Sequence, residues 1–289
     1  MIKYSIIVCS YNRYEFLKAT IDSILEVIEN RNDFEILIID NNSKDQTVNI
    51  KQEYLGNNHV KYFLELKQGL SHARNRGLNE ALGDILIYLD DDIELVSNYF
   101  KTCDAIFANK DIIISGGKVL PHKINIPAWL PLKYYHLVSV FDLGDQPKFV
   151  TCIMGGNFAI RRIDALKIGL YDTALGRNGK KLGGGEEVDY QNRARLMGYK
   201  IYYDPKQNIL HKINEKLNEN YILNYSKELG RSERIIDSSI SKFKTLKKIV
   251  KSIAALGLFC SLRHLVKQEK RITYLKIINN YAIGYLGFK

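Results

Sequence analysis

The sequence is poor in residues that cross-link or interrupt a fold. Its 289 residues include four cysteines, five prolines and one tryptophan. The cysteines lie far apart in the sequence, which excludes a zinc site or a redox pair built from neighbouring thiols. We therefore expect reduced thiols that pack as apolar side chains at Cys9, Cys103, Cys152 and Cys260.

Apolar runs long enough to cross a membrane are lacking in the C-terminal part. The longest uncharged run there, from Ile253 to Cys260, falls well short of the roughly 20 residues that a spanning helix needs. Strand-forming residues begin at Tyr4, so the start leaves no room for the charged and apolar regions of a secretion signal. We expect a cytoplasmic protein.

Acidic residues are scarce at the end of the chain. Residues 240–289 contain 11 Lys+Arg and one acid, Glu269, whereas residues 1–239 hold 31 charges of each sign, so the net charge of +10 lies entirely in the tail. Residues 1–239 have no net charge, unlike a nucleic-acid-binding protein with a positively charged surface. Nucleic acid is therefore not expected as a partner. The basic end favours peripheral contact with an anionic membrane surface, or packing on the body or on another subunit. The oligomeric state is left open.

Apolar runs alternate with helical stretches along the first half, a pattern typical of a parallel sheet with crossover helices. The predicted strands are YSIIVC, FEILIID, VKYFLEL and DILIYLD. Ser43 followed by Gln46 predicts a capping box at a helix start. Ligands of such sheets bind beyond the carboxyl ends of the strands, so residues 10–13, 40–43 and 90–92 should converge on one crevice.

Three consecutive aspartates, Asp90, Asp91 and Asp92, follow the last of these strands. Their like charges would repel one another in a poorly solvated crevice, so a positive group is expected beside them. Strand alternation places Asp91 on the side opposite to the other two. Carboxylate ligands at a substrate-binding edge suit Mn²⁺ or Mg²⁺, which binds substrate phosphates in its remaining positions. The alternative is that the aspartates only cap the next segment.

Six segments resemble, in order, the motifs of glycosyltransferase family 2 proteins with the GT-A fold. They are SIIVCSYNR, IIDNNSKD, GLSHARNRGL, YLDDDI, GGNFAIRR and GEEVDYQNRARLMGYKIYY. The resemblance implies an α/β, Rossmann-like fold with a mostly parallel central sheet. It covers residues 1–211, with a nucleotide-binding half over 1–110 and an acceptor-binding half over 111–211. A basic, mostly helical extension follows over 212–289.

The family resemblance also assigns the donor side of the site. The residues implied to bind the nucleotide or the donor sugar are Ser10, Tyr11, Arg13, Asp40, Arg74, Asp90, Asp91 and Gly156. Asp40 would accept hydrogen bonds from the base or ribose. For Arg74 a structural ion pair is an equally good interpretation. Asp92 would bind the metal most directly, with Asp90 nearer the ribose and His211 as a further metal ligand; a packed histidine is the alternative.

The catalytic base implied by the resemblance is Glu187, where the family more commonly has aspartate. It would take the proton from an acceptor hydroxyl while the diphosphate departs on the opposite face, which inverts the anomeric centre. Gly183, Gly184 and Gly185 precede it and suit a loop that moves or approaches a ligand closely. The acceptor side is assigned to Trp129, Asn157 and Glu186, although the simpler interpretation of Trp129 is that it anchors its loop, and Asn157 could sit in a tight turn.

The predicted function is therefore sugar transfer from a nucleotide-diphosphate sugar, with a UDP-sugar favoured, to a carbohydrate or lipid-linked acceptor in bacterial surface polysaccharide or glycoconjugate synthesis. A Rossmann dehydrogenase is disfavoured because the first turn, CSYNRYEF, lacks the glycines that admit a pyrophosphate. A metal-dependent nucleotidyltransferase and a non-catalytic membrane or nucleic-acid adaptor remain as alternatives.

Overall fold

The computed structural model describes residues 2–28, 31–179, 181–262 and 269–288. Within it the chain divides into two compact units. The first comprises Met1–His122, Val140–Thr173 and Glu186–Lys212; the second comprises Lys123–Ser139, Ala174–Gly185 and Ile213–Lys289. The predicted domain boundaries stay a prediction.

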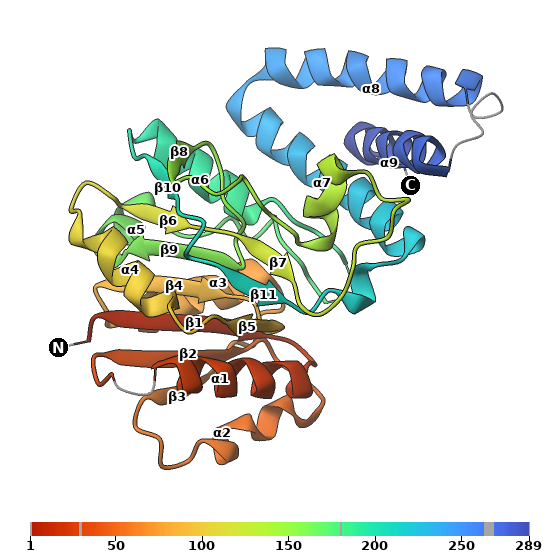
Figure 1. Ribbon diagram of the computed structural model, residues 1–289. Coiled ribbons are helices and arrows are strands. Elements are labelled where there is room, and N and C mark those ends of the chain that lie inside the picture. Colours follow the sequence, from red (N-terminus) through yellow and green to blue (C-terminus); the bar gives the residue numbers. More distant parts are fainter. Residues whose placement is uncertain (1, 29–30, 180, 263–268, 289) are drawn as a thin grey trace. The chain divides into compact units, whose positions relative to one another are not determined.

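The first unit is built on an eight-stranded sheet with the order β3-β2-β1-β4-β9-β6-β10-β8 (Figure 1). Its first four strands are parallel, and β9 runs antiparallel to both of its neighbours. The strands are β1 Tyr4–Ser10, β2 Phe34–Asp40, β3 Val60–Leu64, β4 Ile85–Leu89, β6 Ile114–Gly116, β8 Lys148–Val150, β9 Asn157–Arg161 and β10 Ile201–Tyr203. The mostly parallel α/β sheet expected from the sequence is confirmed.

A second, three-stranded sheet has the order β5-β11-β7. Its strands are β5 Ile93–Leu95, β7 Val119–Pro121 and β11 Ile209–His211. In the register of this sheet, His211 on β11 stands opposite Ile93, the residue that follows the three aspartates. This pairing brings a distant part of the sequence to the end of β4.

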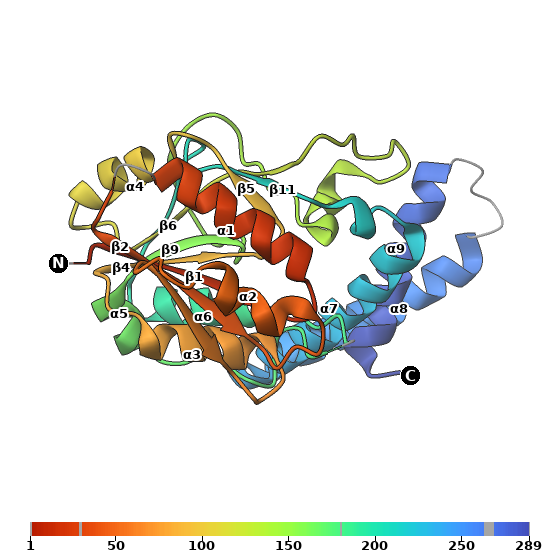
Figure 2. The same cartoon turned by 90° about the horizontal axis from the view of Figure 1, so that it is seen from below.

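Helices cover both faces of the large sheet (Figure 2). Because strand residues alternate between faces, Ile6 and Val8 of β1 pack in one apolar core while Ile7 packs in another. The first core includes residues of α1 and α4, and the second includes residues of α3, α5 and α6. These helices are α1 Tyr14–Ile28, α3 Leu70–Glu80, α4 Tyr99–Ala108, α5 Arg162–Ile168 and α6 Glu186–Leu196.

The predicted capping box is wrong. The short 3₁₀ helix η1 (Gln46–Asn49), which leads into α2 (Ile50–Glu53), is capped by Asp45, whose side chain accepts a hydrogen bond from the backbone N–H of Thr47. Ser43 uses its hydroxyl to accept a hydrogen bond from the backbone N–H of Asn12. The helix thus begins at Gln46, two residues later than a capping box at Ser43 requires, and Ser43 instead joins two loops at the edge of the sheet.

The second unit contains η2 Leu132–Val138, η3 Asn214–Lys216, α7 Glu219–Ile240, α8 Lys242–Leu262 and α9 Glu269–Leu286. Helices α7 and α9 approach at two glycines: a Cβ atom on Gly230 would lie 2.2 Å from the carbonyl oxygen of Tyr281, and one on Gly284 would lie 1.8 Å from that of Lys227. The helical tail is confirmed for its described residues, whereas residues 263–268 and 289 lie outside them.

Cys9, Cys103 and Cys152 are free thiols, as expected. The side chain of Cys260 lies outside the described residues. Within the part of the chain that is described, no helix combines the length and apolarity needed to span a membrane.

Candidate functional site

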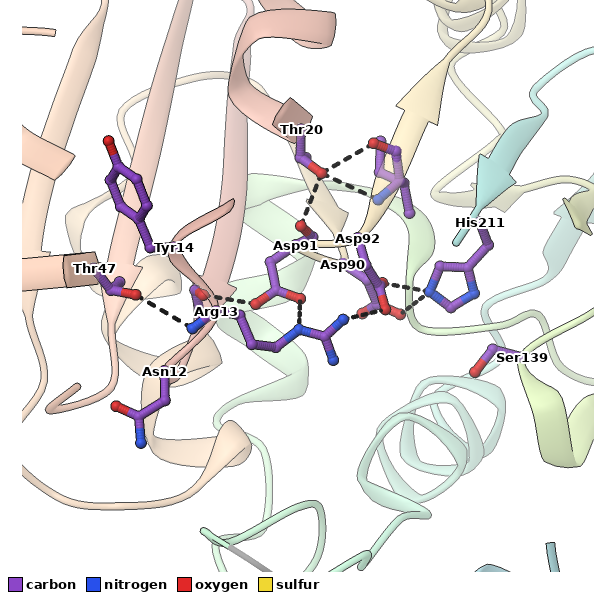
Figure 3. A network of polar contacts seen from close by, with 12 residues as sticks. Asn12, Arg13, Tyr14, Thr20, Thr47, Asp90, Asp91, Asp92, Ser139 and His211 are labelled. Atoms are coloured by element: carbon purple, nitrogen blue, oxygen red, sulfur yellow. Dashed lines mark hydrogen bonds and ion pairs between the residues drawn. The ribbon is translucent and has the colours of Figure 1, made fainter. Parts of the chain in front are cut away.

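The three aspartates after β4 point in two directions. On one side, Ser10 at the end of β1 donates its hydroxyl hydrogen bond to Asp91 Oδ2 at 2.6 Å. On the other side, Asp90 and Asp92 face His211 (Figure 3). Thr20 of α1 stabilises the turn between the three aspartates and β5, because its hydroxyl donates a hydrogen bond to the carbonyl oxygen of Asp91 at 2.9 Å. Thr20 was missed from the sequence because it lies within the apolar stripe of α1.

Asp90, Asp92 and His211 form a candidate metal site. Each offers one ligand atom, and these atoms all lie within 4.8 Å of one another. His211 Nε2 lies 2.5 Å from Asp92 Oδ1 and 3.6 Å from Asp90 Oδ2. Two carboxylates and an imidazole, clustered at a strand end, fit a divalent ion such as Mn²⁺ or Mg²⁺. The predicted ligand set is therefore brought together in space.

Arg13 lies against the same aspartates. Its Nη2 atom is 2.8 Å from Asp92 Oδ2, and its Nε atom is 3.4 Å from Asp91 Oδ1. Burial raises the pKa of Asp91 to about 6, while the positive charge of Arg13 acts in the opposite direction. Arg13 thus supplies part of the positive charge that was expected beside the aspartates.

A second polar cluster surrounds Arg74, a buried residue of α3. Arg74 Nη1 donates a hydrogen bond to Glu186 Oε1 at 2.7 Å, and its Nη2 lies 4.0 Å from Asp90 Oδ1. The structural ion pair considered for Arg74 is thus present. Glu186 Oε2 is buried and has no hydrogen-bond partner among the described residues. A buried carboxylate oxygen of this kind is suited to accept a hydrogen bond from a ligand.

Glu187 is the second residue of α6, next in sequence to Glu186, and is half-buried. Burial raises the pKa of its carboxyl to about 8, with repulsion from Glu186 adding to the rise and attraction to Arg74 opposing it. A carboxylate with a raised pKa binds a proton more strongly than an exposed one, which suits it to general-base chemistry.

Gly155 and Gly156 separate the two clusters. A Cβ atom on Gly156 would lie 2.3 Å from Asp90 Oδ2, and one on Gly155 would lie 2.9 Å from Arg74 Nη2 and 3.1 Å from the Cβ atom of Glu187. Any larger residue would displace these side chains. Glycine here is therefore explained by the close approach of the aspartate and the Arg74 clusters.

Asp40 is fully buried at the end of β2. Its Oδ1 atom accepts a hydrogen bond from the backbone N–H of Ser43 at 2.9 Å, and its Oδ2 atom accepts one from the hydroxyl of Tyr62 at 2.7 Å. Tyr11 is half-buried in the bend after β1. Nucleotide contacts of these residues stay predictions. Tyr62 was missed from the sequence because nothing distinguishes it from the other strand residues of VKYFLEL.

Asn157 has a structural role in this geometry. Its side chain is fully buried, accepts a hydrogen bond from the hydroxyl of Tyr99 at 2.9 Å and donates to the carbonyl oxygens of Gln207 at 2.6 Å and Lys118 at 3.2 Å. Since both amide hydrogens are used within the protein, Asn157 is left out of the acceptor site proposed below. Trp129 is half-buried in the second unit, and its acceptor role stays a prediction.

The glycines before Glu187 are explained within the second unit. A Cβ atom on Gly183 would lie 2.2 Å from the carbonyl oxygen of Gly176, and one on Gly184 would lie 3.0 Å from Leu229 and from Tyr225 of α7. Gly185 has φ of +89°, which favours glycine. These contacts within the protein account for the three glycines, and a close approach of this loop to a ligand stays a prediction.

Known glycosyltransferases are similar to this chain in sequence. The family model "Glycosyl transferase family 2" matches residues 5–169, more than half of the chain. A glucosyl-dolichyl phosphate glucuronosyltransferase of Haloferax volcanii is 26% identical over 244 residues, which are 81% of this chain and 77% of that protein. A GalNAc(5)-diNAcBac-PP-undecaprenol beta-1,3-glucosyltransferase of Campylobacter jejuni is 38% identical over 105 residues, 35% of this chain and only 33% of that protein.

Solved structures show the same fold. The mannosyltransferase PcManGT of Pyrobaculum calidifontis, solved with GDP-Man and Mn²⁺, has a TM-score of 0.68 at 15% identity, covering 99% of this chain and 87% of the other. TarS 1-349 of S. aureus, solved with UDP-GlcNAc, has a TM-score of 0.57 at 15% identity. The match covers 99% of this chain and 91% of the TarS chain. The predicted GT-A fold is confirmed. By its family match and its fold, this chain belongs to glycosyl transferase family 2.

Proposed function

We propose that this glycosyltransferase is an inverting, metal-dependent enzyme that moves a sugar from a nucleotide-diphosphate sugar to an acceptor hydroxyl. The observation that carries the proposal is the arrangement of two clusters on either side of Gly155 and Gly156. One cluster, Asp90, Asp92 and His211, can hold a divalent ion. The other, Glu186 and Glu187 with Arg74, supplies a base and a buried hydrogen-bond acceptor.

The residues have separate roles in the transfer. Asp90, Asp92 and His211 would hold Mn²⁺ or Mg²⁺, which supplies positive charge to stabilise a departing diphosphate. The acceptor oxygen forms its bond to the anomeric carbon as the bond from that carbon to the phosphate oxygen breaks, with the electron pair leaving on the diphosphate. Glu187 takes the proton of the acceptor hydroxyl. Glu186, fixed by Arg74, accepts a hydrogen bond from the acceptor through its free Oε2 atom.

The acceptor that we propose is lipid-linked, in the synthesis of a bacterial surface polysaccharide or glycoconjugate. The names of the Haloferax volcanii and Campylobacter jejuni relatives, which contain dolichyl phosphate and PP-undecaprenol, support a polyprenyl-linked substrate. A UDP-sugar donor stays a prediction, since the structural neighbours were solved with GDP-Man in one case and UDP-GlcNAc in another. A cytoplasmic location, peripheral on the inner face of the membrane, is proposed on the basic tail alone.

A panel of nucleotide sugars tests the proposal. Nucleotide release is measured with each donor in the presence of Mn²⁺ and again with a chelator. We expect release of the nucleoside diphosphate from one donor, with the release abolished by the chelator. Release of pyrophosphate would instead identify a nucleotidyltransferase, and no turnover of any donor would favour the adaptor alternative.

A further inference from the structure

Helix α8 exposes an apolar face to solvent. The side chains that form it have relative exposures of 76% for Phe243, 60% for Leu246, 60% for Val250, 58% for Ile253 and 51% for Leu258. The first four recur at spacings of three and four residues, which places them on one side of the helix. Exposed apolar side chains grouped in this way mark an interaction surface.

The opposite side of α8 holds the helix in its unit. Ser252 is buried there, and Lys244 Nζ lies 2.7 Å from Asp237 Oδ1 of α7. Lys248 of α8 forms ion pairs with Glu233 and Asp237 of α7. The helix is therefore fixed by one side, and the apolar face on its other side is left uncovered by the described residues.

The uncovered face carries positive charge and no negative charge. Residues 242–262 contain five lysines and no Asp or Glu. Lys242, Lys247 and Lys251 are exposed, and none has an acidic partner among the described residues. Helical spacing places Lys242 on one border of the apolar stripe and Lys247 and Lys251 on the other.

We propose that this face of α8 docks on an anionic lipid bilayer, with the helix lying in the plane of the headgroups. The apolar stripe enters the boundary of the acyl chains, and the flanking lysines contact lipid phosphates. A bilayer matches both the apolar and the charged features. A symmetric contact with a second copy would oppose lysines to lysines, which disfavours a dimer through this face. The docking surface does not depend on the transfer reaction, although lipid-linked acceptors would give it a purpose.

Vesicle flotation of the full-length chain tests the proposal. Vesicles of phosphatidylcholine alone are compared with vesicles of mixed phosphatidylcholine and phosphatidylglycerol, each at low and high salt. We expect binding only to the anionic vesicles and weaker binding in salt. Point variants are used because removal of all residues after Asp237 would also remove α9, which packs closely on α7.

Two variants test the apolar stripe and the flanking lysines of this face. Phe243→Glu should lower the vesicle partition coefficient at least about tenfold. Lys247→Gln with Lys251→Gln should lower it about 30-fold, because each lysine near an anionic surface contributes about a fivefold factor. Matched controls are Leu196→Glu on α6, whose leucine is also exposed, and Lys110→Gln after α4.

The outcomes distinguish this proposal from the transfer reaction. Unchanged circular dichroism and melting temperature establish that the variants fold, as expected for side chains that face solvent. Equal binding to both vesicle types, or unchanged binding by Phe243→Glu, would overturn docking of this face on an anionic bilayer. A wild-type dimer that Phe243→Glu converts to a monomer, measured by light scattering, would overturn it in favour of a second copy. Transfer to a water-soluble acceptor without vesicles reports on catalysis separately.

Discussion

Replacement of Glu187 by glutamine should abolish transfer and stabilise the metal-free protein above neutral pH. Glutamine keeps the shape of the side chain and cannot take a proton, so we expect the transfer rate to fall at least about 100-fold. The KM for the donor should change by less than about threefold, since Glu187 belongs to the acceptor side of the proposed site. The measurement is the initial rate of nucleotide release with Mn²⁺.

The stability gain follows from the raised pKa. A shift from 4.5 to about 8 corresponds to at most about 5 kcal/mol, at about 1.4 kcal/mol per pKa unit. Solvent reaches this half-buried carboxylate and screens its charge, so we expect about 2 kcal/mol. Because the folded pKa is the higher one, the folded state holds a proton that the unfolded state has released between pH 4.5 and 8. Wild-type stability therefore falls as the pH rises through this window.

Urea unfolding at pH 5, 7 and 9 without metal measures this difference. The two proteins should be nearly equal in free energy of unfolding at the lowest pH, and the glutamine variant should be more stable at the highest. Glu186→Gln is the matched control, because it removes the nearer of the two carboxylates paired with the buried Arg74 and should destabilise the fold at neutral pH. Parallel stability curves for wild type and Glu187→Gln, or undiminished transfer by this variant, would refute the reasoning.

Three further predictions concern the metal site and the packing. Asp92→Asn should weaken Mn²⁺ binding at least about tenfold by calorimetry, because it removes a carboxylate ligand; unchanged affinity would exclude this residue as a ligand. Gly156→Ala should keep the melting temperature within about 4 °C and lower the transfer rate at least tenfold, since its Cβ atom would meet Asp90 Oδ2 at 2.3 Å; full activity would contradict the close approach. Gly284→Ala should cost about 2 kcal/mol in urea unfolding, because its Cβ atom would meet the carbonyl oxygen of Lys227 at 1.8 Å; a stability equal to wild type would contradict the observed helix contact.

Features that are local in the sequence were predicted well. The continuous apolar runs specified β1, β2 and β4 to within one or two residues, and alternation correctly placed Asp91 opposite to Asp90 and Asp92. The capping box failed because Asp45, two residues after Ser43, caps the helix instead and accepts a hydrogen bond from the backbone N–H of Thr47.

The sequence by itself determined the α/β class, the carboxylates at the strand ends and the family, because each depends on local periodicity or on ordered motifs. Only the tertiary structure determined which side chains contact one another in the site. The pairing of β11 with β5 brings His211 to Asp92, and the packing of α3 beside α6 gives Arg74 its bond to Glu186. Burial also assigned Asn157 to a structural network. These contacts join residues distant along the chain, and strand register and packing of the whole core set their geometry.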